Sequence, residues 1–285
     1  METSMTLNVT AQSAPCGAVV RGIDLSQPLD AATQQAVRSA WLQHQVLAFV
    51  DQALTLEDLE RFALGIGPYG QDPYFESVPG HPHVAQVKRE ADETSTLFAD
   101  NFHSDWSFLA SPPAATLLYG DIIPPVGGDT LFANQYAAWD ALSPAMKALL
   151  HGRQGVHSAR RGYAKSGRYG EQDKGRSMAI RFDDSALATQ LQPVARVHPE
   201  TGRTALFVSP GYTIGTDGRA DEEASPLLKE LFQHQARPEF VYRHVWQQGT
   251  LLLWDNRCLV HAATGGYQGH RRLLHRITVS ERPTP

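Results

Sequence analysis

The chain has 285 residues, 42% of them hydrophobic, and a formal net charge of −5 at pH 7. This length and apolar content predict one large domain with a buried core, spanning residues 1–285. No basic surplus favours nucleic-acid binding, and no apolar run approaches the ~20 residues that span a bilayer. We therefore expect neither a nucleic-acid partner nor a membrane partner.

The N-terminus and the cysteines indicate a cytoplasmic protein. The first ten residues lack the charged segment and apolar stretch of a signal peptide. Only two cysteines occur, Cys16 and Cys258, and two distant cysteines do not make a disulfide framework. A reducing compartment is the simpler expectation.

The first 65 residues predict a strand, a helix, a strand and a helix. Asp30 is a candidate N-cap for a helix, because apolar residues follow it at helical spacing. Residues 47–50 form a short apolar run typical of a strand. Thr55 and Asp58 have the spacing of a capping box that starts the second helix. The residues expected on its buried side are Leu59, Phe62 and Ala63.

From about residue 82 onward, short apolar runs alternate with Gly, Pro and Asp turns. This spacing is typical of an antiparallel β-sandwich or jelly roll, so we expect a mostly β fold with flanking helices. A helix over 136–150, broken at Ser143 and Pro144, and a second helix over 225–235 interrupt the strands. The expected strands are 83–87, 114–119, 130–132, 205–208, 250–254 and 273–279.

Residues 160–176 form a basic, glycine-rich stretch. Six Lys and Arg residues against two acidic residues give it a charge of +4, and it contains four glycines. Such a stretch is either a solvated surface loop or a lid that attracts an anionic substrate. We predict a mobile lid over residues 157–182.

The tripeptide His103-Ser104-Asp105 is the first candidate metal-binding motif. On an extended segment residues i and i+2 project to one face, so His103 and Asp105 could bind one ion together. A lone H-x-D tripeptide is weak support, and a third ligand must come from far along the chain. Among the twelve histidines, His261 is the best candidate, because it lies on an expected strand beside a turn.

Two histidines and one aspartate leave three positions of an octahedron open on one face. Non-haem iron oxygenases use this arrangement to bind a chelating cosubstrate and O2. Structural zinc sites are closed and rich in cysteine, which this set is not. A zinc-type metallohydrolase with the same triad and a non-enzymatic anion-binding β-sandwich are the alternatives.

Two arginines near the C-terminus predict anion binding. On a strand over 272–279, Arg272 and Arg276 share one face and lie ~13 Å apart, at ~3.3 Å per residue. Burying two guanidinium groups is costly unless anions pair with them, and guanidinium binds carboxylates in a bidentate fork. The hydroxyl of Thr130, which follows a Gly-Gly-Asp turn, could donate to the same carboxylate. The alternative is an edge strand with solvated arginines.

Together these motifs closely resemble the taurine dioxygenase and 2,4-dichlorophenoxyacetate dioxygenase family, over nearly the whole chain. Thr130 lies 27 residues after His103, and Arg272 lies 11 after His261, in agreement with the family's order and spacing. The matching stretches are 22–25, 101–105, 127–132, 198–203 and 254–257, together with His261, Arg272 and Arg276.

The resemblance implies a double-stranded β-helix (jelly roll) that binds Fe(II) through His103, Asp105 and His261. It also implies that Arg272 and Thr130 bind the C5 carboxylate of 2-oxoglutarate, that O2 is the oxidant, and that the chain forms a dimer or tetramer. Related halogenases replace the ligand carboxylate with a small residue, so Asp105 favours hydroxylation.

The expected substrate is a small organic anion: a carboxylate, a sulfonate or a sulfate ester. Hydroxylation of its C–H bond, with cleavage where that carbon bears an ether, sulfonate or sulfate ester, is the expected reaction. Gly67 stands where taurine dioxygenase has a sulfonate-binding histidine, which argues for a substrate bulkier than taurine. The residues expected at the substrate are Arg276, Asn101, Trp106, His157, Arg160 and Arg161.

Overall fold

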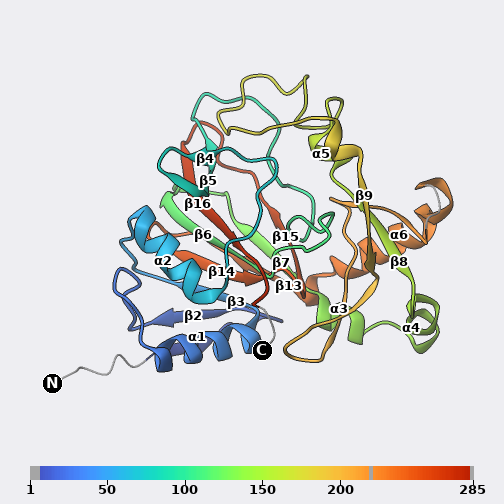
Figure 1. Cartoon of the computed structure of the whole chain (residues 1–285), viewed down its shortest axis with the longest axis horizontal. Helices are drawn as coiled ribbons and strands as arrows, with labels where there is room; N and C mark the ends of the chain where they lie inside the picture. The colour runs from blue at the N-terminus through green and yellow to red at the C-terminus, as the bar shows by residue number, and fades with distance from the viewer. Residues whose placement is uncertain (1–6, 218–220, 283–285) are drawn as a thin grey trace.

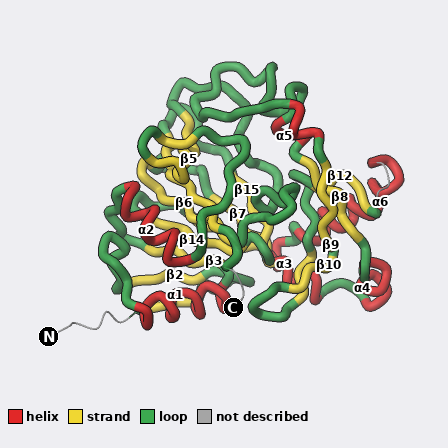
Figure 2. Tube along the Cα trace, in the orientation of Figure 1, coloured by secondary structure: helices red, strands yellow, loops and turns green. Residues whose placement is uncertain are grey.

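A computed structural model describes residues 7–217 and 221–282 of the chain (Figure 1). The described part is mostly β-structure with a smaller share of helix, as the sequence predicts (Figure 2). None of the described helices is both long and apolar enough to cross a membrane.

The largest element is an eight-stranded sheet. All its neighbouring strands are antiparallel except β2 and β3. In spatial order its strands are β1 (Asn8–Ala11), β2 (Ala18–Arg21), β3 (Val46–Phe49), β14 (Leu251–Asp255), β6 (Ala115–Ile122), β16 (Arg272–Val279), β5 (His81–Arg89) and β4 (Ser77–Val78).

A three-stranded antiparallel sheet packs against the centre of this large sheet. Its strands, in order, are β13 (Val241–His244), β7 (Thr130–Asn134) and β15 (Leu259–Ala263). A further sheet contains β12 (Thr213–Thr216), β8 (Gln154–Ser158) and β9 (Thr189–Pro193), and a hairpin contains β10 (Ala195–Val197) and β11 (Thr204–Leu206). Figure 1 shows these two smaller units on the side of the molecule where α4 and α6 lie.

Two N-terminal helices cover the outer face of the large sheet. Helix α1 (Ala31–His44) packs on β3 and β14, and α2 (Leu56–Ile66) packs on β5 and β16. The predicted caps are confirmed: the Asp30 side chain accepts from the Thr33 N–H, and Thr55 forms a capping box with Asp58. A cap of this kind typically stabilises a helix by about 1 kcal/mol.

The other helices lie along the smaller sheets. The predicted break at Ser143 is confirmed, since Ser143 caps the second of two short helices. The four other helices of the described chain are α3 (Gln135–Asp140), α4 (Pro144–Leu150), α5 (Arg160–Tyr163) and α6 (Asp221–Gln235). Two 3-10 turns span Asp184–Leu187 and Pro238–Phe240.

The large sheet has a core on each face. The outer core, beneath α1 and α2, contains Trp41, Phe49 and Leu59. The inner core, between the two main sheets, contains Phe132 and Trp254. Burying a side chain of this size contributes roughly 1.5–3 kcal/mol. The inner core does not fill the space between the sheets completely, and the remaining space is the candidate site.

Several strands were absent from the prediction. Strands β1, β8, β9 and β12 are short and rich in Thr, Gln or Gly, so they lack the apolar runs on which the prediction relied. The strand expected over 205–208 is shifted to Thr204–Leu206. Helix α1 buries Val37, Ala40 and Trp41, as its spacing indicates, whereas the neighbouring alanine at position 36 is exposed.

Candidate metal and anion site

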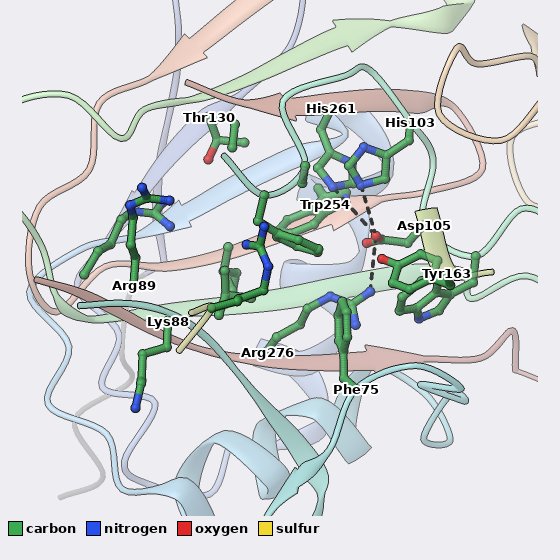
Figure 3. A pocket seen from close by; sticks show the side chains of 18 of the residues that line it. Phe75, Lys88, Arg89, His103, Asp105, Thr130, Tyr163, Trp254, His261 and Arg276 are labelled. Atoms are coloured by element: carbon green, nitrogen blue, oxygen red, sulfur yellow. Dashed lines mark ion pairs between the residues drawn. The ribbon is translucent and has the colours of Figure 1, made fainter. Parts of the chain in front are cut away.

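The structure brings His103, Asp105 and His261 together at one end of the space between the two main sheets (Figure 3). The backbones of His103 and His261 form a β-bridge, with N–H···O distances of 3.0 and 2.8 Å. Their Nε2 atoms lie 3.6 and 3.8 Å from Asp105 Oδ1. Residues 158 positions apart in the sequence are thereby held as neighbours by backbone hydrogen bonds.

The protonation states of these three side chains suit metal binding. Burial lowers the pKa of His261 to about 3 and also lowers that of His103, so both imidazoles are neutral at pH 7. Burial opposes ionisation of Asp105, but the neighbouring Arg276 guanidinium and the hydrogen bond from Thr116 hold its pKa below the usual range. The result is a carboxylate facing two neutral imidazoles.

Neighbouring groups orient these side chains. His103 Nδ1 lies 2.8 Å from the carbonyl oxygen of Asn101, so it carries the proton and Nε2 presents its lone pair. Thr116 donates to Asp105 Oδ2 at 2.6 Å, which leaves Oδ1 directed at the histidines. Asn256 in turn donates to the Thr116 hydroxyl at 2.9 Å.

These residues fit a divalent metal ion. Their ligand atoms lie within 4.8 Å of one another, and all three side chains are buried. A second grouping of His198, Asp255 and Cys258 does not fit one. There His198 Nε2 already bonds Asp255 at 3.0 Å, while Nδ1 accepts from the backbone N–H groups of residues 200 and 201. That grouping is a hydrogen-bonded cluster rather than a metal site.

A cavity of about 800 Å³, including its mouth, opens beside the triad. It runs from the three candidate ligands past β16 to the opposite end of the inner space. Besides the triad, the residues that matter for its chemistry are Thr130, Arg272, Arg276, Phe75, Trp106, Tyr163, Tyr212 and Tyr267.

Arg272, in the cavity wall, is buried without a counter-ion in the described part of the chain. Its Nη2 donates to the Gly128 carbonyl at 3.0 Å, and its Nε has no partner there. The guanidinium lies between the rings of Trp246 and Tyr267, at 5.8 and 5.7 Å. Burial lowers its pKa to about 10, so it is still charged at pH 7. A buried, unneutralised cation is a binding site for an anion.

Thr130 completes this anion site. Its hydroxyl oxygen accepts from Trp246 Nε1 at 3.0 Å, which leaves the hydroxyl proton free to donate into the cavity. Gly128 (φ +74°) permits the close approach, since a Cβ there would lie only 3.1 Å from Arg272 Nε. The two side chains form a clamp for one carboxylate.

Arg276 lies on the same face of β16 but has two acidic neighbours. Its Nη1 donates to Asp72, and its Nη2 lies 3.2 Å from Asp105 Oδ1 in ion-pair geometry (Figure 3). The rings of Phe75 and Trp106 lie 5.0 and 5.1 Å from the guanidinium carbon. Arg276 is therefore a neutralised cation, in contrast to Arg272.

Aromatic side chains form the wall next to Arg276. Trp106 donates to Asp72 at 2.6 Å and has a left-handed backbone (φ +46°), which is costly for a residue with a Cβ. Burial raises the pKa of Tyr163 and Tyr212 well above 10, so both hydroxyls are protonated. This wall suits an apolar or aromatic body with few polar groups.

The structure corrects the expected position of His157. This histidine is buried behind the wall and does not line the cavity, because Ser107 Oγ lies 2.8 Å from its Nδ1 and Thr213 Oγ1 3.4 Å from its Nε2. Arg160 does not line the cavity either. Asn101 and Arg161 line a neighbouring pocket of about 510 Å³ that shares His103 with the main one. Arg161 there donates to the carbonyls of residues 210 and 213.

Part of the expected lid, residues 157–182, covers the cavity mouth. Tyr163 and Arg176 line the cavity, and the segment is tied to residues 93–100 across the mouth. Arg168 forms a bidentate pair with Asp100 at 2.5 and 2.7 Å. Much of the positive charge is thus neutralised internally, which weakens the idea that this stretch attracts an anion. Its mobility remains a prediction.

The sequence offered little indication of several residues in the cavity wall or directly behind it. Asp72 reaches Arg276 across 204 positions, and Thr116 reaches Asp105 across 11. Tyr163 and Tyr212 come from segments read only as loop or lid. Asp72 lies in the Gln-Asp-Pro-Tyr-Phe stretch after α2, where an acidic residue between aromatic ones was the only signal.

A family model described as "Taurine catabolism dioxygenase TauD, TfdA family" matches residues 8–278. The (S)-phenoxypropionate/alpha-ketoglutarate-dioxygenase of Sphingobium herbicidovorans is 29% identical over 98% of this chain and 97% of its own length. The alpha-ketoglutarate-dependent sulfate ester dioxygenase of Pseudomonas putida is 30% identical over 97% of this chain and 90% of its own.

A solved structure extends the similarity to three dimensions. The crystal structure of AAD-2 in complex with Mn(II) and N-oxalylglycine is similar with a TM-score of 0.77 and 28% identity. The alignment covers 99% of this chain and 100% of that one.

Proposed function

This chain belongs to the TauD, TfdA family and is a 2-oxoglutarate-dependent dioxygenase that uses Fe(II) and O2, and we propose that it hydroxylates a C–H bond of a small organic anion. The observation that carries the proposal is the pair of unlike arginines on β16. Among the described residues Arg272 has no counter-ion and suits the cosubstrate, while Arg276 lies beside the candidate metal ligands and the aromatic wall.

We assign the iron to His103, Asp105 and His261, whose neutral imidazoles and carboxylate present ligand atoms to one point. When bound there, iron with 2-oxoglutarate supplies the oxidising chemistry that activates O2. Arg272 and the Thr130 hydroxyl then bind the far carboxylate of the cosubstrate. That contact fixes the cosubstrate at the end away from the metal ligands.

The remaining residues position the substrate and exclude water. Phe75, Trp106, Tyr163 and Tyr212 surround the space next to Asp105 with aromatic surface. Because these side chains are buried, a bound substrate would displace water from the reacting C–H bond. The protonated tyrosine hydroxyls can donate a hydrogen bond to a substrate oxygen but do not act as bases at pH 7.

The proposed substrate carries one carboxylate, sulfonate or sulfate ester on an apolar or aromatic body. The names of the relatives, which act on phenoxypropionate and on sulfate esters, support this class. Hydroxylation of a carbon that bears an ether or sulfate ester oxygen gives a hemiacetal-type product. That product collapses to a carbonyl compound and releases the phenol or sulfate.

We also propose that the two main sheets form a double-stranded β-helix, that residues 1–285 are one domain, and that the chain assembles as a dimer or tetramer in the cytoplasm. The family assignment favours the dioxygenase over the zinc-type metallohydrolase, which has no need of both Arg272 and Thr130.

The proposal is tested by measuring succinate release from 2-oxoglutarate with a panel of aryloxyalkanoates, alkyl sulfates and alkyl sulfonates. We expect at least one aryloxyalkanoate or alkyl sulfate to raise succinate release well above the substrate-free rate, with one product molecule per succinate. A panel in which only substrate-free turnover occurs would contradict the substrate class.

A further inference from the structure

The two buried arginines of β16 differ in a way that bears on substrate selection. Arg272 has no carboxylate within ion-pair distance in the described part of the chain, whereas Arg276 has Asp72 on one side and Asp105 on the other. Asp105 is the candidate metal ligand. Asp72 belongs neither to the candidate metal ligands nor to the clamp of Arg272 and Thr130.

Asp72 lies behind the cavity wall, in contact with two side chains of that wall. Its Oδ1 accepts from both Arg276 Nη1 and Trp106 Nε1, the latter at 2.6 Å. Its side chain is 17% exposed and reaches a small surface pocket outside the cavity, next to Arg181. The Arg276 guanidinium lies near the rings of Phe75 and Trp106. Asp72 therefore holds both the guanidinium and the indole ring of Trp106 in place.

We propose that Asp72 is a specificity-determining residue, the internal counter-ion of Arg276, which a substrate anion must share or displace. This inference rests on the proposed function and states how the substrate site discriminates between anions. Nη1 is bonded to Asp72, whereas Nη2 makes no hydrogen bond among the described residues and lies 3.2 Å from Asp105 Oδ1, so Nη2 is the donor left for a substrate oxygen.

Two consequences follow for the substrate. A compact anion that needs a bidentate fork on guanidinium is disfavoured, because one arm of the fork is already taken. A substrate that offers one oxygen to Nη2 and fills the aromatic wall is favoured, since its affinity comes chiefly from apolar contact. Removing the charge of Asp72 should therefore strengthen binding of anions and leave neutral analogues unaffected.

The test compares phenoxyacetate with its neutral analogue phenoxyacetamide. Both are titrated calorimetrically into the full chain loaded with Mn(II) and 2-oxoglutarate, for the unaltered protein and for Asp72→Asn. We expect Asp72→Asn to lower the Kd of phenoxyacetate about tenfold, equivalent to about 1.4 kcal/mol, and to change that of phenoxyacetamide less than about twofold. Asp72→Ser should act in the same direction and guards against a folding defect in one variant.

Asp121→Asn is the matched control, because it removes a carboxylate that pairs with His275 away from the cavity. It should leave both Kd values unchanged. Equal effects on phenoxyacetate and phenoxyacetamide, or no gain in anion binding in either Asp72 variant, would overturn the inference. A protein that binds neither Mn(II) nor 2-oxoglutarate would instead contradict the proposed function, so the two failures are distinguishable.

Discussion

At the scale of single residues, the metal site depends on side chains that do not face the metal themselves. Thr116 lies on β6 directly across from Thr278 of β16, and its hydroxyl hydrogen-bonds one oxygen of Asp105. Asn256 holds that hydroxyl in turn. Such outer contacts fix a ligand's orientation, and losing one typically weakens metal binding 10–100-fold.

Replacing Thr116 with Val should therefore weaken Mn(II) binding about 10–100-fold, because Asp105 Oδ2 loses its donor while the volume is kept. Equilibrium titration with Mn(II) measures the change. Thr278→Val is the control: the residue is buried opposite Thr116, but its hydroxyl only reaches the Gln71 carbonyl at 3.5 Å. Equal Mn(II) affinities in the two variants would argue that the Thr116 contact is irrelevant.

Arg272→Gln should raise the KM for 2-oxoglutarate roughly 100-fold, since it removes a charge-assisted bidentate contact with the cosubstrate. The protein should be no less stable without cosubstrate, because the lost charge is buried and unpaired in the described structure. Arg243→Gln, at an arginine whose side chain is 62% exposed, should leave this KM unchanged. Succinate release at varied 2-oxoglutarate gives both values.

Local patterns predicted which residue types meet at the site but could not predict all of their partners. His103 with Asp105 and Arg272 with Arg276 were predictable, because period-two spacing places each pair on one face. Asp72 was not, since its contact with Arg276 depends on the path of the chain between α2 and β5. The predicted position of His157 at the substrate was wrong, because nothing in its local sequence reveals that Ser107 and Thr213 hydrogen-bond to its ring behind the aromatic wall.

At the scale of elements, the segment over the cavity mouth is held by contacts with residues 93–100. The hydroxyl of Tyr169 accepts from the backbone N–H of Ala99 at 3.0 Å, and Arg176 donates to the Thr96 carbonyl. Ser177 contacts Glu93 through both its backbone N–H and its hydroxyl. If this segment moves as the predicted lid, these contacts must break together.

Tyr169→Phe should loosen this segment, because the Ala99 N–H loses an acceptor worth about 1 kcal/mol. We expect backbone amides over 164–178 to exchange with deuterium about fivefold faster, and the KM for 2-oxoglutarate to stay constant. Tyr69→Phe removes a tyrosine hydroxyl elsewhere, on the Glu60 carbonyl, and serves as the control. Unchanged deuterium exchange over 164–178 in Tyr169→Phe would contradict a role of this hydrogen bond in holding the segment.

The buried His157 joins β8 to β12 and makes the fold sensitive to acid. Burial lowers its pKa to about 3, whereas an unfolded histidine titrates near 6.5. Below pH 6.5 the unfolded chain therefore binds the extra proton, and the free energy of unfolding falls as pH drops toward 3. At pH 5 this loss amounts to about 2 kcal/mol from this residue.

His157→Asn should reduce the difference in unfolding free energy between pH 8 and pH 5 by about that 2 kcal/mol, even if the variant is less stable at both. Urea unfolding at the two pH values measures it. His151→Asn, at an exposed histidine, should leave the difference unchanged. A pH dependence in His157→Asn equal to that of the unaltered protein would show that another group is responsible.

At the scale of the whole molecule, the cavity exists because two sheets of unequal width pack face to face. The large sheet supplies Arg272 and Arg276, and the narrow sheet supplies Thr130 and His261. The mostly β class and most long strands were predictable from alternating apolar runs and turns. The strand order was not, because β14, β6 and β16 are neighbours in the sheet although they are distant in the chain.

The most direct measurement is anaerobic addition of Fe(II) and 2-oxoglutarate to the protein, followed by visible absorption spectroscopy. We expect a weak charge-transfer band that appears only with both components. Arg272→Gln should require about 100-fold more 2-oxoglutarate to reach it. Absence of the band in a folded protein, with activity retained in zinc, would contradict the assignment of the triad and Arg272 to iron and 2-oxoglutarate.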